Sequence, residues 1–167
     1  MPVSQHWTRS WTGPADALAD PYPSGTQSRS SGQIVLVVDA SILAVALADD
    51  GPDGDRARDR LRGEQLAAPE IVDLEVVSVL RGQLRKEMLD ERRAALALRD
   101  LVDLPLQHAS HLPLLPRCWE LRTNLTPYDA AYVSLAEILD AALLTGDRRL
   151  ASAPGPRCSI EVLLPSS

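Results

Sequence analysis

Four acidic residues occupy positions at which a charged side chain usually has a structural or functional role. Asp39 directly follows the apolar run 34–38, and Glu75 interrupts an apolar helical pattern. Asp129 and Asp147 each open a later segment. Carboxylates gathered from distant parts of a chain repel one another, so a cation is the simplest means of holding them together. If the four converge, the sequence predicts a site for Mg²⁺ or Mn²⁺, hard ions that prefer oxygen ligands.

The chemistry that suits such a site is phosphodiester hydrolysis. A bound metal ion lowers the pKa of a water molecule and stabilises charge on the attacking and leaving oxygens. Histidine is not needed for this reaction. His6 falls in a polar tail, and His108 and His111 fall in what the pattern indicates is a polar loop, so all three are predicted to be surface residues.

Glu75 is the acid that is hardest to explain as a purely structural residue. Its helical neighbours at three and four positions are Ile71, Val72, Ser78 and Val79, which form an apolar face. An ionised carboxylate buried there without a partner would be very costly. Either a cation meets it, or an arginine forms an internal salt bridge with it, and the sequence leaves both open.

Each of the other three acids has a structural alternative. Asp39 could cap the next helix, although Ser41 is already placed for that role. Asp129 lies in a first helical turn, where the helix dipole favours a negative charge. Asp147 could hold a turn in Thr145-Gly146-Asp147-Arg148. Because four such coincidences together are improbable, a shared site is favoured.

The elements that must position these acids alternate along the chain. Strands are predicted at residues 34–38, 65–68, 104–106, 141–145 and 159–163. Helices are predicted at residues 42–48, 53–63, 69–86, 90–101, 114–122 and 126–139, with one helical turn at 148–151. This order predicts an α/β protein with a parallel sheet and helices on both faces, in which ligands bind beyond the carboxyl ends of the strands. Asp39 and Asp147 both lie at such ends.

The length and composition of the chain indicate its domain organisation and its cellular compartment. The chain has 167 residues, 45% hydrophobic content and no Phe, which suits one globular domain, predicted at residues 34–167. Residues 1–33 are rich in Ser, Gly, Pro and Thr and are predicted to be a disordered extension, in which Trp7 and Trp11 could form a docking turn. No stretch approaches the roughly 20 apolar residues of a membrane span, and no secretion signal is visible. Two cysteines without metal-ligand spacing indicate a reduced, cytoplasmic protein.

The net charge of -6 argues against a protein that binds nucleic acid by its overall charge. A nucleic-acid partner would need local arginines. Arg117, Arg148 and Arg149 lie near predicted site segments and could bind substrate phosphate. For Arg117 and Arg148, structural pairing with a nearby acid is an equal alternative. The arginines and aspartates that alternate over residues 55–62 are instead predicted to form a solvated helix face.

Four separated motifs, taken in order, resemble those of PIN domains. They are Val38-Asp39-Ala40-Ser41, Pro69-Glu70 followed by Glu75-Val76-Val77-Ser78-Val79-Leu80, Trp119-Glu120-Leu121-Arg122 through Tyr128-Asp129-Ala130-Ala131-Tyr132, and Leu144-Thr145-Gly146-Asp147-Arg148. The chain is similar above all to VapC-type ribonuclease toxins of type II toxin–antitoxin systems, over about residues 34–163. The resemblance implies a three-layer α/β/α fold with a central, mainly parallel sheet of four or five strands.

The resemblance also implies a function and a site. It implies a Mg²⁺-dependent endoribonuclease (Mn²⁺ possible) that cleaves RNA, is inhibited by a cognate antitoxin and forms a homodimer; no membrane partner is expected, since no stretch is long and apolar enough to span a membrane. The implied catalytic and metal-binding residues are Asp39, Glu75, Asp129 and Asp147. Among these, Asp39 and Asp129 would be direct ligands, with Ser41 and Thr145 as hydroxyl supports. Ser78 stands where many relatives have Asn, so the hydrogen bonding there should differ.

Three other functions stay open on sequence alone. A PIN nuclease of RNA maturation would share every residue named above. A module that only binds metal or a partner is disfavoured by the intact acids. A phospho-accepting receiver domain would need a lysine at the acidic pocket, and Lys86, the one lysine of the chain, lies at the end of a charged helix.

Overall fold

The computed structural model describes residues 35–165. The extension predicted at residues 1–33, with Trp7 and Trp11, lies outside the described residues, as does His6.

A five-stranded sheet in the order β3-β2-β1-β4-β5 forms the middle layer of the domain. All four strand pairs are parallel. The strands are β1 (Val35–Val38), β2 (Gln65–Pro69), β3 (Leu106–Ala109), β4 (Ala142–Thr145) and β5 (Ile160–Val162). The predicted parallel sheet of four or five strands is therefore confirmed.

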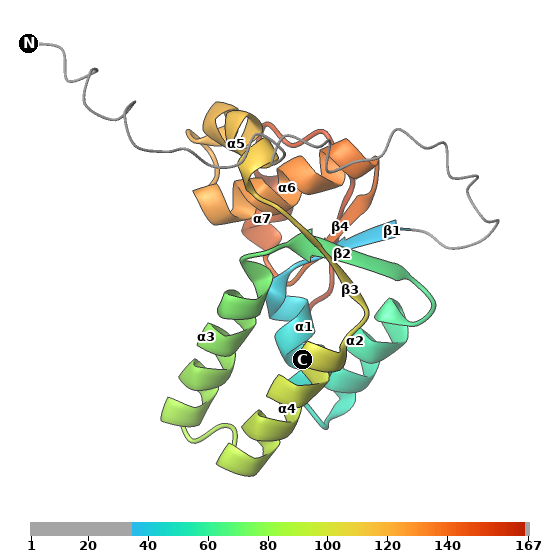
Figure 1. The fold of residues 1–167 in the computed structure, drawn as a ribbon, viewed down its shortest axis with the longest axis vertical. Helices are drawn as coiled ribbons and strands as arrows, with labels where there is room; N and C mark the ends of the chain where they lie inside the picture. Colours follow the sequence, from blue (N-terminus) through green and yellow to red (C-terminus); the bar gives the residue numbers. More distant parts are fainter. Residues whose placement is uncertain (1–34, 166–167) are drawn as a thin grey trace, which may run out of the picture. The chain divides into compact units, whose positions relative to one another are not determined.

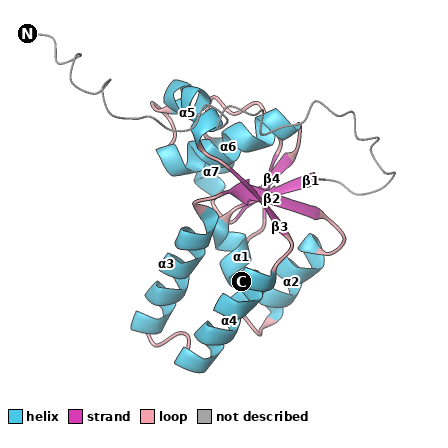
Figure 2. Ribbon diagram, viewed as in Figure 1, coloured by secondary structure: helices cyan, strands magenta, loops and turns pink. Residues whose placement is uncertain are grey.

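Helices cover both faces of this sheet, as Figures 1 and 2 show. On one face lie α1 (Ala40–Ala48), α2 (Pro52–Leu61), α3 (Val72–Arg85) and α4 (Glu91–Asp103). On the other lie α5 (Leu115–Leu121), α6 (Pro127–Leu139) and α7 (Arg148–Ser152), and a short 3₁₀ helix, η2 (Leu112–Leu114), precedes α5. This is the expected three-layer α/β/α arrangement.

The core follows from the apolar runs. Leu36, Val37 and Val38 in β1 are fully inaccessible, because a strand in the centre of a parallel sheet is covered on both faces. The segment Ala130–Ala136 of α6 is also buried, and α6 packs against β1, β2 and β4. None of the described helices combines the length and the apolar character needed to cross a membrane.

Three local expectations were wrong. The third strand begins at Leu106 rather than residue 104, because Pro105 has no N–H for the ladder with β2. The helix expected from residue 69 begins at Val72, since Pro69 ends β2 and the N–H of Glu70 bonds to the carbonyl of Ala109 at 3.0 Å.

The third concerns His108, which belongs to β3 and not to a loop. It is nevertheless exposed, as is His111, so both are surface residues as predicted. His108 Nε2 lies 3.0 Å from a carboxylate oxygen of Asp73.

Candidate metal centre

The candidate site lies where β1 and β4 end side by side. From β1 the chain passes through Asp39 into α1 on one face, and from β4 it passes through Gly146 and Asp147 into α7 on the other face. The N–H of Asp39 bonds to the carbonyl of Leu144 at 2.9 Å, which ties the two strand ends together. A point where the connections diverge to opposite faces is the usual ligand site of an open parallel sheet.

Asp39 is oriented by donors on both sides. Its side chain caps α1 by accepting the N–H of Ser41 at 3.2 Å, and it also accepts the Ser41 hydroxyl at 3.1 Å. The hydroxyl of Thr145 donates to the same carboxylate. The structure thus places on Asp39 both of the hydroxyls that were predicted as supports. The expectation that Ser41 caps the helix was wrong, because α1 begins at Ala40 and Asp39 is the cap.

Gly146 allows this close packing. Its N–H bonds to the Ser41 hydroxyl oxygen at 3.1 Å, and a Cβ at this position would lie 3.1 Å from the same oxygen. A side chain at residue 146 would therefore crowd the Ser41 hydroxyl, and glycine lets the loop after β4 approach α1 without that shift.

Glu75 reaches the site from α3 and is partly buried. The hydroxyl of Tyr132, on α6, donates to its Oε2 at 2.6 Å. Burial raises the pKa of Glu75, the Tyr132 hydrogen bond opposes this rise, and the charges of Asp39 and Asp129 add to it. Glu75 is thus close enough to both Asp39 and Asp129 for their charges to repel its own.

Tyr132 is a site residue that the sequence did not single out. It is almost completely buried, and burial together with the Glu75 carboxylate raises the pKa of its phenol, so it stays a proton donor. The available signal was spacing, since Tyr132 follows Asp129 by three positions on one helix face.

Asp129 lies in the first turn of α6, where Thr126 is the predicted and observed cap. The Thr126 oxygen accepts the N–H of Asp129 at 3.1 Å, and its hydroxyl donates to the Asp129 carboxylate at 2.7 Å. This reciprocal pair fixes the carboxylate at the helix start.

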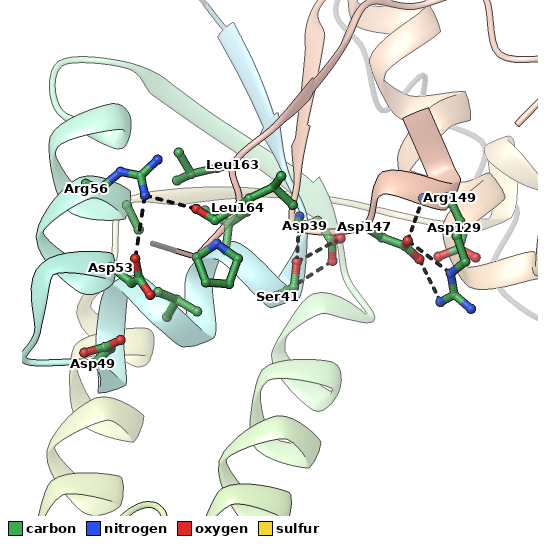
Figure 3. Close-up of a pocket in the computed structure, with 15 residues that line it drawn as sticks. Asp39, Ser41, Asp49, Asp53, Arg56, Asp129, Asp147, Arg149, Leu163 and Leu164 are labelled. Carbon is green, nitrogen blue, oxygen red and sulfur yellow. Dashed lines mark hydrogen bonds and ion pairs between the residues drawn. The ribbon is translucent and has the colours of Figure 1, made fainter. Parts of the chain in front are cut away.

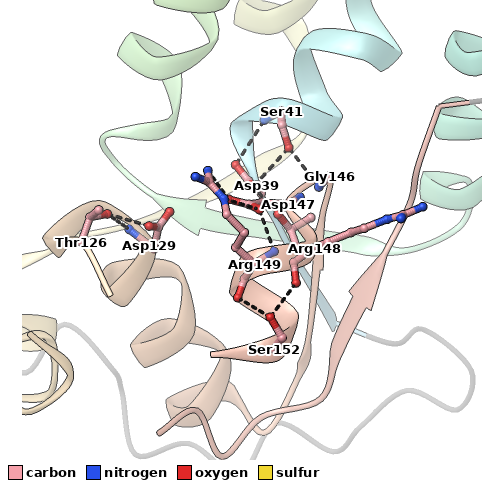
Figure 4. Close-up of polar contacts among 10 residues, drawn as sticks. Asp39, Ser41, Thr126, Asp129, Gly146, Asp147, Arg148, Arg149 and Ser152 are labelled. Carbon is pink, nitrogen blue, oxygen red and sulfur yellow. Dashed lines mark hydrogen bonds and ion pairs between the residues drawn. The ribbon is translucent and has the colours of Figure 1, made fainter. Parts of the chain in front are cut away.

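Asp147 is turned toward Arg149 (Figure 4). It caps α7 by accepting the N–H of Arg149 at 2.8 Å, and the Arg149 guanidinium contacts its two oxygens at 2.9 and 3.2 Å. The Arg149 side chain lowers the pKa of Asp147, and the backbone hydrogen bond adds to the effect. The fourth acid is therefore already paired.

A pocket of about 610 Å³ opens beside these groups (Figure 3). Asp39, Asp129 and Asp147 line one side of it, and α2 and the segment 163–165 line the other. Arg56 holds that segment by donating to the carbonyl of Leu164 at 3.1 Å. The acids thus face a space open to a ligand.

The donor set fits a hard divalent cation, since it consists of carboxylate oxygens whose mutual repulsion such an ion would relieve. In residues 35–165, however, no three His, Cys, Asp or Glu side chains stand close enough together to hold a metal ion as they are oriented. The shared metal site stays a prediction.

Arg117 and Arg148, which were both predicted to bind phosphate, have different surroundings in the structure. All three guanidinium nitrogens of Arg117 are engaged: they donate to Glu137 at 2.7 and 3.0 Å, to Glu120 at 2.7 Å and to the carbonyl of Gly155 at 2.9 Å. This geometry favours the structural alternative, a clamp between α5, α6 and the segment after α7. Arg148 is exposed, and its side chain extends away from the carboxylates (Figure 4); its predicted role in substrate binding stays a prediction.

We expect Arg117→Gln to lower the free energy of unfolding by about 2 kcal/mol, between the values for exposed and buried ion pairs. The pair is well covered, with side chains 19% and 13% exposed, so Glu137 would be left without its main partner. Urea unfolding measures the change, with Arg99→Gln on the exposed face of α4 as control. Unchanged stability together with weaker RNA binding would instead restore a substrate role for Arg117.

Because Arg117 is paired with Glu137, the effect of Arg117→Gln on stability should depend on pH. Burial alone would raise the pKa of Glu137, but hydrogen bonds from Arg117 and from the N–H of Arg157 outweigh it, so the pKa is lowered. A lowered carboxylate pKa stabilises the fold above the unfolded-state pKa, and this contribution is lost as the pH falls through the folded-state pKa. The stability difference between wild type and Arg117→Gln should therefore shrink on acidification.

Comparisons with known proteins agree with this architecture. Residues 36–156 match the PIN domain family model. The chain is 38% identical over 129 residues to VapC ribonuclease Mb0985 of Mycobacterium bovis, which covers 77% of this chain and 98% of that protein. It is 41% identical over 128 residues to ribonuclease VapC1 of Mycobacterium tuberculosis, which covers 76% and 96%.

Solved structures share the fold at lower identity. PAE2754 from Pyrobaculum aerophilum superimposes with a TM-score of 0.57 at 24% identity, over 85% of this chain and 93% of that one. VapBC2 from Rickettsia felis, solved with a fragment of promoter DNA, gives 0.56 at 17% identity, over 77% and 98%. With the family model matched over most of the described residues and relatives aligned along almost their whole length, the chain belongs to the PIN domain family.

Proposed function

We propose that the chain is a divalent-metal-dependent endoribonuclease that acts as the toxin of a toxin–antitoxin pair, with Mg²⁺ as its cation and Mn²⁺ as an alternative. The observation that carries the proposal is that Glu75, on α3, lies within electrostatic reach of both Asp39, at the end of β1, and Asp129, on α6. Relatives named ribonucleases, 38% and 41% identical and matched over nearly their full length, support RNA as the substrate.

The carboxylates and the hydroxyls of the site would have different roles. Asp39, Glu75, Asp129 and Asp147 would hold the cation through carboxylate oxygens. When bound, such an ion supplies an acidified water and stabilises charge on the transferred phosphate. Hydroxyls of Thr145, Tyr132 and Thr126 already orient three of the carboxylates, so less side-chain freedom is lost when a ligand is bound.

An antitoxin partner follows from the same charges. The pocket is lined by the site aspartates, and a basic side chain of a partner would be attracted there on Coulomb grounds. The Rickettsia felis neighbour is VapBC2 bound to promoter DNA, which supports a partner protein for this fold. We extend the proposal to a cognate antitoxin and a homodimeric toxin, which co-purification and sedimentation would test.

The function is tested by incubating partner-free protein with a mixed RNA pool in Mg²⁺, in Mn²⁺ and in EDTA. Cleavage with metal and none with EDTA is expected. No cleavage by metal-replete, partner-free protein would overturn the proposal. Growth arrest on expression, relieved by a co-expressed small partner, would distinguish a toxin from a nuclease of RNA maturation.

Tyr132→Phe is expected to move the acid limb of the pH–rate profile to higher pH. Tyr132 donates the hydrogen bond that opposes the raised pKa of Glu75, so its loss lets that pKa rise further. Glu75 must be ionised to hold a cation, and the rate falls as the pH drops through its pKa. Cleavage rates measured across pH 5–9, roughly the range in which such limbs are resolved, give the comparison.

Tyr128→Phe is the matched control, because Tyr128 lies on the same helix but is exposed. It should leave the profile unchanged. If the two variants have the same acid limb, Tyr132 does not tune Glu75.

A further inference from the structure

Arg149 occupies a position that the proposed chemistry does not explain. It lines the pocket together with Asp39, Asp129 and Asp147, and its guanidinium bonds both oxygens of Asp147 (Figures 3 and 4). It also lies within electrostatic reach of Asp129. A positive charge of the chain itself therefore stands among the carboxylates that would hold a metal ion.

The contact with Asp147 is easily broken. The Arg149 side chain is 92% exposed, and exposed ion pairs contribute little to stability. The backbone N–H of Arg149 bonds to Asp147 as well, at 2.8 Å, so the cap of α7 can persist when the guanidinium leaves. A divalent cation, with twice the charge, would compete with the guanidinium for this carboxylate.

A guanidinium released at this point has an obvious ligand. The aspartates of the pocket repel RNA phosphate, and a chain of net charge -6 does not attract it overall. Guanidinium binds phosphate oxygens in a bidentate manner and needs no burial to do so. Arg149 is placed to supply that contact beside the candidate cleavage site.

Other arginines near the site are placed differently. Arg148, the adjacent residue, extends away from the carboxylates (Figure 4). Arg56, on the far wall of the pocket, bonds to the carbonyl of Leu164 and pairs with Asp53.

We propose that Arg149 is an exchangeable counter-ion of the site: it neutralises Asp147 while no cation is bound, and it binds the RNA phosphate once a cation has taken Asp147. This inference rests on the proposed nuclease function and adds to it a substrate-binding residue that is coupled to metal binding.

The test compares wild type, Arg149→Gln and Arg148→Gln in two binding measurements on the full chain. Calorimetric titration with Mn²⁺ in the absence of RNA reports the competition for Asp147. We expect Arg149→Gln to bind Mn²⁺ up to about fivefold more tightly than wild type, the range set by a surface ion pair, and Arg148→Gln to match wild type.

The second measurement is the affinity for a labelled RNA oligonucleotide in Ca²⁺, with the RNA checked for integrity on a gel. We expect Arg149→Gln to bind RNA more weakly than wild type. The slope of log affinity against log salt concentration should be smaller by about one, as expected for the loss of one phosphate contact. Unchanged or weaker Mn²⁺ binding by Arg149→Gln would overturn the proposal, as would unchanged RNA affinity. Equal effects of the two variants on Mn²⁺ binding would also overturn it, since they would reflect net charge alone.

These readouts do not require cleavage. If wild type fails to cut RNA in Mg²⁺, the proposed nuclease function fails, while the two affinities still decide whether Arg149 acts as inferred.

Discussion

Asp39→Asn should strongly reduce RNA cleavage and leave the fold in place. Asp39 lies at the junction of β1 and α1, and it faces the pocket. Replacing one carboxylate oxygen by an amide nitrogen removes the negative charge that attracts a cation. Because a bound metal ion contributes several kcal/mol of charge stabilisation, the loss in kcat/KM should be on the order of 10³.

The same substitution keeps the helix-capping role of Asp39, while the hydroxyls of Ser41 and Thr145 lose Oδ2 as their acceptor. Asn is as good a helix cap as Asp, so the bond from the N–H of Ser41 to the side-chain oxygen can remain. Urea unfolding should therefore give a loss of no more than about 2 kcal/mol relative to wild type, chiefly from the buried Thr145 hydroxyl. The two readouts together separate lost chemistry from lost structure.

Asp90→Asn is the matched control. Asp90 caps α4 by accepting the N–H of Arg93 at 2.8 Å, so the chemical change at a helix cap is the same, but it does not line the pocket. This variant should cleave RNA at the wild-type rate. If Asp39→Asn cleaves as fast as Asp90→Asn in Mg²⁺, the candidate metal centre is wrongly assigned.

The placement of the acids was predictable where it depends on strand ends. An apolar run of β-branched residues ending at Asp39, and a second strand ending before Asp147, were enough to bring both to one edge of a parallel sheet. Glu75 was identifiable because a charge on an apolar helix face requires a partner. That partner is Tyr132 and not an arginine, a choice that depends on how α3 and α6 pack and that no local pattern contains.

Side-chain orientation was not predictable. Ser41 and Asp39 are both good helix caps two positions apart, and the end of β1 decides between them. Asp147 was expected to face a shared cation, but it is paired with the exposed Arg149, two residues away. An exposed pair of this kind is set by local geometry with small energies, which sequence patterns do not resolve.

The packing of helix α2 was also not predictable from the sequence. Its alternating charges predict a solvated face, and the pairs Arg58–Asp55 and Arg62–Asp59 are present. The opposite face is buried, however, through Gly54, and its close approach to α1 is visible only in the tertiary structure.

Gly54→Ala should destabilise the protein by about 3 kcal/mol, at the upper end of the usual cost of overpacking. A Cβ at Gly54 would lie 1.8 Å from the carbonyl oxygen of Asp49 and 2.7 Å from its carbonyl carbon, atoms of the backbone at the end of α1. Backbone cannot rotate away as a side chain can, so α2 as a whole would have to move. Arg58, which bonds to the carbonyls of Ala46 and Asp49 at 2.8 Å, would be strained by that movement.

Gly82→Ala is the control with the opposite expected sign. Gly82 lies in α3, and a Cβ there would meet no atom within 4 Å. Alanine stabilises a helix interior relative to glycine by about 0.5–1 kcal/mol, because the unfolded chain loses conformational freedom. Both variants make the same chemical change in a helix, so urea unfolding of the pair isolates the contact between α1 and α2. Equal stabilities of the two variants would mean that α2 does not pack on α1 through Gly54 as the structure places it.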